Sequence, residues 1–292
     1  MKAIQVLKNQ PKVLSLEVTT RCNLECIYCT KPIEDRELDT ELLQRVRNEL
    51  GDFEKVIICG IGESFLYTKL YELIAEFKDQ KFCIVTNGTI PINYHKLNMN
   101  GNVEMLIFSI DAIEQERLDQ INGRYKYEKL LKNLEAYDNY NNESKNKIQR
   151  VLNCTLNEHN ITEIMKLVEF AHQQKFETIH FSLPRGNESF IEEKQVELNE
   201  TLMKASKKAR KYGMFFADPF ETCCVYFKWI TPYLSINGDI FACAETLYLN
   251  QRVGNLLQDN FKNIWPSPEY KKFQTGVDCQ DCKFLSNCKF KF

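Results

Sequence analysis

Three cysteines lie close together near the start of the chain, in the spacing C-x3-C-x2-C. They are Cys22, Cys26 and Cys29, and they follow directly after the apolar, β-branched residues 13–18. Three thiolates at this spacing can bind three irons of a four-iron cube and leave the fourth iron without a protein ligand. A structural zinc site or a ferredoxin loop needs a fourth ligand nearby, and the next cysteine is Cys59. The pattern therefore predicts a [4Fe–4S] cluster with one iron open for chemistry.

Six of the twelve cysteines lie in residues 213–292, and these predict a second metal site. They are Cys223, Cys224, Cys243, Cys279, Cys282 and Cys288. Clustered cysteines in a reducing compartment indicate metal ligands rather than disulfides. Four thiolates complete either one [4Fe–4S] cluster or one zinc site, so a zinc knuckle is the alternative.

Apolar runs alternate with helical patterns along residues 13–212. Strands are expected at residues 13–18, 55–60, 81–88, 103–111, 150–156 and 177–183, and helices at 41–50, 66–78, 125–140, 161–174 and 192–212. Such alternation predicts parallel strands joined by right-handed crossovers, which is an α/β fold. Six units form an open, partial (β/α)6 barrel. The first cysteine triplet follows the first strand, at the strand end where such barrels carry their chemistry.

The pattern changes after residue 212. Short apolar runs on either side of Asn237-Gly238 predict a β-hairpin. We therefore predict two domains, a barrel at residues 1–212 and a smaller cysteine-rich module at residues 213–292. The module is too small to depend on an apolar core alone, so a bound metal is expected to stabilise it.

The first triplet, with Tyr28 directly before its last cysteine, resembles the signature of the radical S-adenosylmethionine (SAM) superfamily. By this resemblance Tyr28 is expected among the cofactor-binding residues. The resemblance implies that the open iron chelates SAM and that an electron from the cluster releases a 5′-deoxyadenosyl radical. It also assigns SAM contacts to the ends of later strands.

Gly60, Gly62 and Glu63 look like the Gly-Gly-Glu-Pro motif that holds the methionine amino group of SAM. The second glycine is displaced here, and Ser64 stands where the family has proline. The positions at which relatives bind the SAM ribose are occupied by Ser109, Asp111 and Asn153.

The C-terminal cysteines resemble the auxiliary-cluster modules called SPASM and twitch domains. Cys224, Gly238 and Cys243 fit the opening of that pattern, and the C-x2-C-x5-C run from Cys279 fits its later part. The remaining cysteines of a full SPASM pattern are missing, so one auxiliary cluster is expected and two [4Fe–4S] clusters in all. From Cys224 onward the chain has five thiols, whereas one [4Fe–4S] cluster takes four ligands, so one of the five thiols is not needed as a ligand.

The adjacent pair Cys223-Cys224 is the unusual feature of this module. Neighbouring side chains of an extended segment point to opposite sides, so one thiol can bind the cluster while the other faces the barrel. Either cysteine fits the family spacing; we assign Cys224 to the cluster and Cys223 as the catalytic residue. This layout resembles the epipeptide epimerases of the superfamily, which convert L- to D-residues.

That resemblance implies abstraction of an α-hydrogen and return of another from a thiol. It further implies a ribosomally synthesised precursor peptide as substrate and a flavodoxin- or ferredoxin-type electron donor. One alternative is a maturase that forms thioether or other oxidative cross-links with the same groups. A sulfatase-maturase type is disfavoured because its seven-cysteine module is incomplete here. The non-enzymatic alternative is an iron–sulfur electron-transfer or zinc-stabilised binding protein.

Composition limits the partners and the location. The formal net charge of −2 over 292 residues argues against nucleic acid as a partner. No apolar run is long enough to span a bilayer, and the N-terminus lacks a signal-peptide core. We therefore expect a cytoplasmic protein without a membrane partner.

Overall fold

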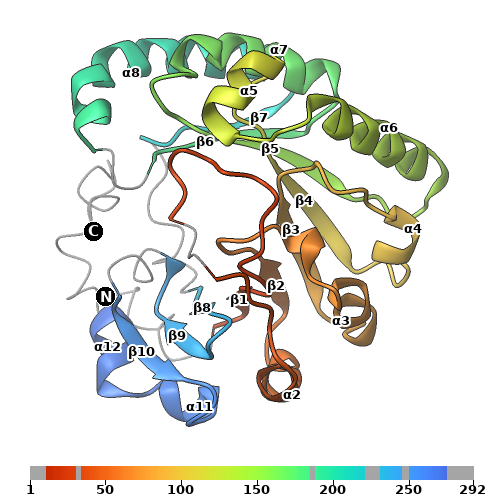
Figure 1. Ribbon diagram of the computed structural model, residues 1–292, viewed down its shortest axis with the longest axis vertical. Coiled ribbons are helices and arrows are strands. Elements are labelled where there is room, and N and C mark those ends of the chain that lie inside the picture. The colour runs from red at the N-terminus through yellow and green to blue at the C-terminus, as the bar shows by residue number, and fades with distance from the viewer. Residues whose placement is uncertain (1–10, 31–33, 185–187, 221–230, 245–249, 275–292) are drawn as a thin grey trace. The chain divides into compact units, whose positions relative to one another are not determined.

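The computed structural model describes residues 11–30, 34–184, 188–220, 231–244 and 250–274 (Figure 1). The chain divides into two compact units. The first consists of Met1–Arg21, Pro32–Cys83 and Thr222–Phe292, and the second of Cys22–Lys31 and Ile84–Glu221. Strand β3 (Lys81–Thr86) begins in the first unit and ends in the second.

The first unit is built on the parallel pair β1 (Val13–Leu16) and β2 (Lys55–Ile58). Helix α2 (Thr40–Leu50) connects them, and the carboxylate of Asp39 caps it by accepting the Leu42 N–H at 2.8 Å. This helix confirms the one predicted at residues 41–50. Capping of this kind satisfies one of the free N–H groups of the first turn.

The other edge of β1 carries the predicted hairpin. Strand β8 (Tyr233–Leu234) pairs parallel with β1, and β9 (Asp239–Phe241) returns antiparallel to β8. Strand β10 (Arg252–Asn255) pairs with β9, which gives the order β10-β9-β8-β1-β2. Among its described residues this unit also contains η1 (Ser64–Leu66), α3 (Leu70–Glu76), α11 (Phe261–Ile264) and α12 (Pro268–Gln274).

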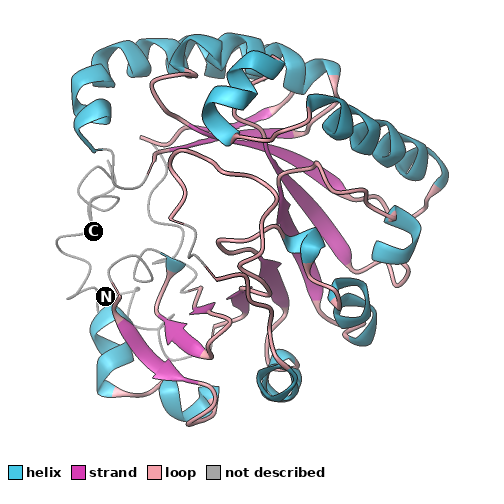
Figure 2. Cartoon of the chain, in the orientation of Figure 1, coloured by secondary structure: helices cyan, strands magenta, loops and turns pink. Residues whose placement is uncertain are grey.

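Besides the end of β3, the described part of the second unit contains parallel strands in chain order. They are β4 (Val103–Ser109), β5 (Gln149–Thr155), β6 (Thr178–Ser182) and β7 (Phe215–Ala217). Its helical elements are α4 (Tyr94–Leu97), α5 (Gln115–Asn122), α6 (Tyr127–Glu143), η2 (Ile161–Glu163), α7 (Ile164–Gln173) and α8 (Glu188–Lys211). Figure 2 shows α6, α7 and α8 on one side of these strands.

All six strands predicted for the barrel are present, and the strands of the second unit run parallel as expected. The prediction missed the short elements β7, β10, α4, α5, α11 and α12. The domain boundary at residue 212 remains a prediction. In the described parts of the chain, no helix has both the length and the apolar character needed to cross a membrane.

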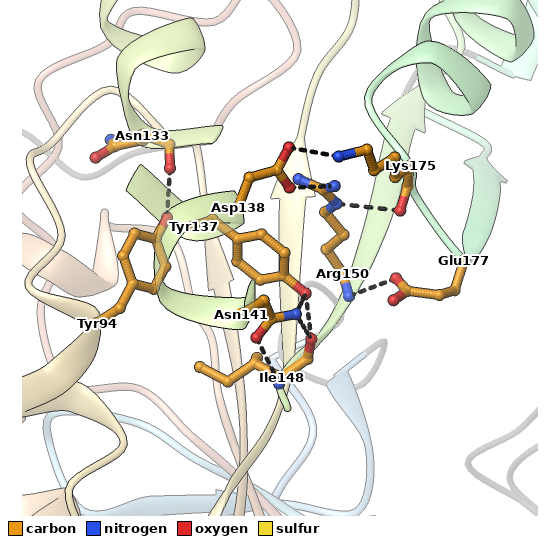
Figure 3. Close-up of polar contacts among 9 residues, drawn as sticks. All are labelled: Tyr94, Asn133, Tyr137, Asp138, Asn141, Ile148, Arg150, Lys175 and Glu177. Carbon is orange, nitrogen blue, oxygen red and sulfur yellow. Dashed lines mark hydrogen bonds and ion pairs between the residues drawn. The ribbon is translucent and has the colours of Figure 1, made fainter. Parts of the chain in front are cut away.

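A buried arginine joins the helices to the start of β5 (Figure 3). The Arg150 side chain is only 2% exposed, and its guanidinium pairs with Asp138 at 2.7 Å and donates to the Lys175 carbonyl at 3.1 Å. It also lies over the Tyr137 ring, with its central carbon 4.4 Å from the ring centroid. A buried cation needs such partners because its desolvation costs several kcal/mol.

We expect Asp138→Ala to lower the free energy of unfolding by about 3 kcal/mol, because it leaves the Arg150 guanidinium buried without its counter-ion. The matched control is Lys175→Ala, which removes the other, 69%-exposed cation from Asp138 and should cost less than about 1 kcal/mol. Urea denaturation of the metal-free protein measures both. Equal effects of the two substitutions would contradict this account of the buried pair.

Candidate functional site

The end of α5 holds the loop that carries the first cysteine triplet. The Glu25 N–H donates to the Asn122 carbonyl and the Ile27 N–H donates to the Ile121 carbonyl, each at 2.9 Å. These two hydrogen bonds flank Cys26 on both sides. The loop therefore has a fixed backbone at its central cysteine.

The three thiols differ in exposure. Cys22 and Cys26 are half-buried, whereas Cys29 is exposed. Burial raises the pKa of the Cys26 thiol to about 12, and the nearby Asp111, Cys22 and Cys29 add to this effect, while a hydrogen bond from Asn122 opposes it. A thiolate at Cys26 consequently needs a neighbouring cation, which iron would supply.

The chemistry of the donor set fits an iron–sulfur cluster. Cys22, Cys26 and Cys29 are three thiols on one loop, and in a [4Fe–4S] cube each thiolate binds a different iron. Within the described ranges, no three His, Cys, Asp or Glu side chains converge closely enough to hold one metal ion.

Asp111 connects this loop to the strand ends. Its Oδ2 accepts hydrogen bonds from the Tyr28 hydroxyl and from Asn122 Nδ2, the latter at 2.7 Å, and its Oδ1 accepts the Thr155 N–H at 2.8 Å. Burial raises the pKa of Asp111, and the hydrogen bonds from Tyr28, Asn122 and Thr155 oppose this rise. Both carboxylate oxygens are thus engaged within the protein, and so is the hydroxyl of Tyr28.

Ser109 and Asn153 lie side by side, because they are register partners on β4 and β5. Both are half-buried. Paired residues of parallel strands project to the same face, so these two side chains share a surface. His180 continues the row on β6 as the register partner of Asn153, and its burial lowers the pKa of the imidazole. This face carries three adjacent polar groups.

The glycines of the second motif allow close packing within the first unit. A Cβ at Gly60 would lie 2.7 Å from Glu17 Cγ, and one at Gly62 would lie 2.3 Å from the Thr19 carbonyl oxygen. Both positions therefore require glycine. Glu63 is buried; its N–H donates to the Arg21 carbonyl at 2.8 Å and its Oε1 accepts the Phe65 N–H at 3.0 Å.

Glu17 is a structural carboxylate that the sequence analysis missed. It is buried at the end of β1, where Oε1 accepts the Ile61 N–H at 3.1 Å and Oε2 accepts the Ile236 N–H at 3.3 Å. Burial raises the pKa of this carboxyl, and the two backbone hydrogen bonds oppose the rise. Glu17 thereby joins the glycine loop to the hairpin. In the sequence, the signal for this role is a single acidic residue within the apolar strand predicted at residues 13–18.

Of the predicted C-terminal ligands, Cys243 is half-buried and lies two residues after the end of β9. The other five thiols of that region lie outside the described residues. They are Cys223, Cys224, Cys279, Cys282 and Cys288. Their assignment as one catalytic group and four ligands remains a prediction.

The chain matches the models of two known protein families. Residues 16–168 match the model of the radical SAM superfamily, and residues 223–289 match SPASM, an iron–sulfur cluster-binding domain. The chain is 25% identical to the AdoMet-dependent heme synthase of Methanosarcina barkeri, across 97% of this chain and 92% of that one.

Solved structures share the fold at low identity. SuiB of Streptococcus suis, bound to its precursor peptide SuiA, superposes with a TM-score of 0.71 at 18% identity, covering 98% of this chain and 74% of SuiB. The structure of native anSMEcpe with bound AdoMet and the Kp18Cys peptide superposes with a TM-score of 0.71 at 16% identity, covering 96% of this chain and 88% of anSMEcpe.

The superfamily model covers more than half of the chain and includes the loop held by Asp111 and Asn122. The match implies SAM and a [4Fe–4S] cluster as cofactors, and the SPASM match implies additional iron–sulfur ligation. The protein therefore belongs to the radical SAM superfamily, with an α/β radical SAM fold followed by a SPASM domain.

Proposed function

We propose that this enzyme epimerises L- to D-residues in a ribosomally synthesised peptide. The observation that carries the proposal is the tandem pair Cys223-Cys224. The SPASM pattern begins with a single cysteine, so this pair provides one thiol more than the pattern requires. A peptide substrate is supported by the fold shared with SuiB and anSMEcpe, whose structures contain bound peptides.

Cys22, Cys26 and Cys29 are the proposed ligands of the cluster that binds SAM. With both cofactors bound, this site supplies a 5′-deoxyadenosyl radical that removes an α-hydrogen from the peptide. Tyr28 helps to hold the loop through its hydrogen bond to Asp111.

The remaining SAM contacts are proposed on two sets of residues. Gly60, Gly62 and Glu63 are assigned to the methionine amino group, as in the family motif. Ser109 and Asn153 are the better candidates for the ribose, because they are adjacent and half-buried. Asp111 stays in this set, although both of its oxygens already accept hydrogen bonds inside the protein.

The second hydrogen comes from Cys223 in this proposal. Its S–H bond breaks as a new C–H bond forms on the peptide α-carbon, which leaves a sulfur radical on Cys223. One electron and one proton then restore the thiol. An auxiliary cluster held by four of the thiols Cys224, Cys243, Cys279, Cys282 and Cys288 would supply this electron. A flavodoxin- or ferredoxin-type protein would supply the separate electron that SAM cleavage needs.

An oxidative reaction on a cofactor or peptide is the second candidate. The similarity to the heme synthase, which extends over 97% of this chain, favours a cofactor as the substrate. Such a reaction removes two hydrogens and needs no hydrogen donor, so it leaves the tandem cysteines without a distinct use. A cytoplasmic location and the lack of nucleic-acid and membrane partners remain predictions from composition.

Replacing Cys22, Cys26 and Cys29 together by alanine should abolish 5′-deoxyadenosine formation, because only this triplet leaves an iron open for SAM. Chromatography of reduced, SAM-treated protein measures the product, and iron analysis should still find the auxiliary cluster. SAM cleavage by the triple variant would show that the open site has been placed wrongly.

Metal analysis tests the C-terminal module. The anaerobically reconstituted protein should contain about eight irons and eight sulfides, as two [4Fe–4S] clusters require, and the triple alanine variant should contain half as much. Stoichiometric zinc in the triple variant would instead identify the module as a zinc site.

The variants Cys223→Ala and Cys224→Ala form a matched pair. Cys223→Ala should retain SAM cleavage and the auxiliary cluster but yield no D-residue, because the donor thiol is missing. Cys224→Ala should perturb the auxiliary cluster itself, which its absorption and electron paramagnetic resonance (EPR) spectra report. If Cys223→Ala still forms deuterium-labelled D-peptide in deuterated water, or loses the auxiliary cluster, the two roles are reversed.

A further inference from the structure

Asn122, at the C-terminal end of α5, lies between a cluster cysteine and a buried carboxylate. Its side-chain nitrogen is 3.3 Å from Cys26 Sγ and 2.7 Å from Asp111 Oδ2, so each of its two N–H groups has an acceptor. The residue is only 3% exposed. Water therefore does not compete for these hydrogen bonds.

The orientation of the amide is determined by its neighbours. In the described structure Asn122 Oδ1 is buried and has no hydrogen-bond partner. Turning the amide over would place this oxygen against the Asp111 carboxylate and the Cys26 sulfur, both of which are acceptors. The N–H group consequently faces the sulfur, and Asn122 Oδ1 is left without a hydrogen-bond partner.

The donor is also held rigidly. The Asn122 carbonyl accepts the Glu25 N–H, and Asp111, to which the amide is anchored, is fixed by Tyr28 and by the Thr155 N–H. These contacts hold the backbone and the side chain of Asn122. The N–H group therefore cannot readily turn away from Cys26.

We infer that Asn122 donates a hydrogen bond to the Cys26 sulfur of the bound cluster and thereby raises the reduction potential of that cluster. Hydrogen bonds to cluster sulfurs stabilise the more negative, reduced state. Asn122 is thus a positioning residue, and its amide also lies between the sulfur and the negative charge of Asp111. This role depends on the cluster alone and not on which substrate the enzyme uses.

The test compares Asn122→Leu and Asn122→Ala with the control Asn133→Leu. Leucine is close to asparagine in size but has no donor, and alanine leaves room for a water. Asn133 is another buried asparagine of the same unit; its amide bonds to the Gly88 and Ile90 carbonyls at 2.7 Å. The control therefore removes a buried amide without touching a cysteine.

The measurement is a redox titration of the reconstituted full-length protein, followed by EPR with and without SAM. The signal that changes on adding SAM belongs to the triplet cluster, and a variant with Cys22, Cys26 and Cys29 replaced by alanine supplies the auxiliary spectrum for subtraction. We expect Asn122→Leu to shift the midpoint to a more negative potential and Asn122→Ala to shift it less. Asn133→Leu should keep the wild-type midpoint.

Two results would overturn the inference. One is a wild-type midpoint in Asn122→Leu with the cluster fully loaded. The other is loss of the triplet cluster from both Asn122 variants but not from Asn133→Leu. That result would show that Asn122 holds the loop in place and does not set the reduction potential of the cluster.

Discussion

The candidate cluster site depends on the hydrogen bonds that the buried carboxylate of Asp111 accepts. It receives hydrogen bonds from the cysteine loop through Tyr28, from α5 through Asn122, and from the end of β5 through Thr155. Three segments that are distant in sequence are thereby held at one point. Because burial by itself disfavours the charged form, the donors are needed to keep a carboxylate there.

In the first unit, Glu17 is likewise a buried carboxylate that accepts hydrogen bonds from separate segments. This buried carboxylate accepts backbone N–H groups from the glycine loop and from the segment after β8. Gly60 and Gly62 make the arrangement possible, since a Cβ at either position would overlap the end of β1 or the residues after it. In each unit, then, a buried acid fixes a loop to the strands, and close packing of the chain requires the two glycines independently of any ligand.

The sequence predicted the elements whose signal is local. The six strands, the helix at residues 41–50 and the hairpin at Asn237-Gly238 were all correct, because periodicity and turn chemistry are encoded by neighbouring residues. Helix α5 and strand β7 were missed because they are short and depend on packing. The cysteine triplet was identified from its spacing, and its role as a set of cluster ligands remains a prediction.

The roles of individual polar residues were harder to predict. Asn122 and Cys26 are 96 positions apart and Glu17 and Ile236 are 219 apart, so no local pattern indicates their contacts. Spacing placed Asp111 at the correct strand end but could not tell that Tyr28 and Asn122 would occupy its oxygens. His180 received no assignment, although strand register puts it next to Asn153.

The configuration and mass of the product test the proposed reaction most directly. The wild-type enzyme would be incubated in deuterated water with SAM, a reductant and a candidate precursor peptide, and the product would be hydrolysed for chiral amino-acid analysis. The account predicts one solvent deuterium on each D-residue and no other change in mass. A product lighter by two hydrogens, with every residue still in the L configuration, would contradict it and favour oxidative maturation.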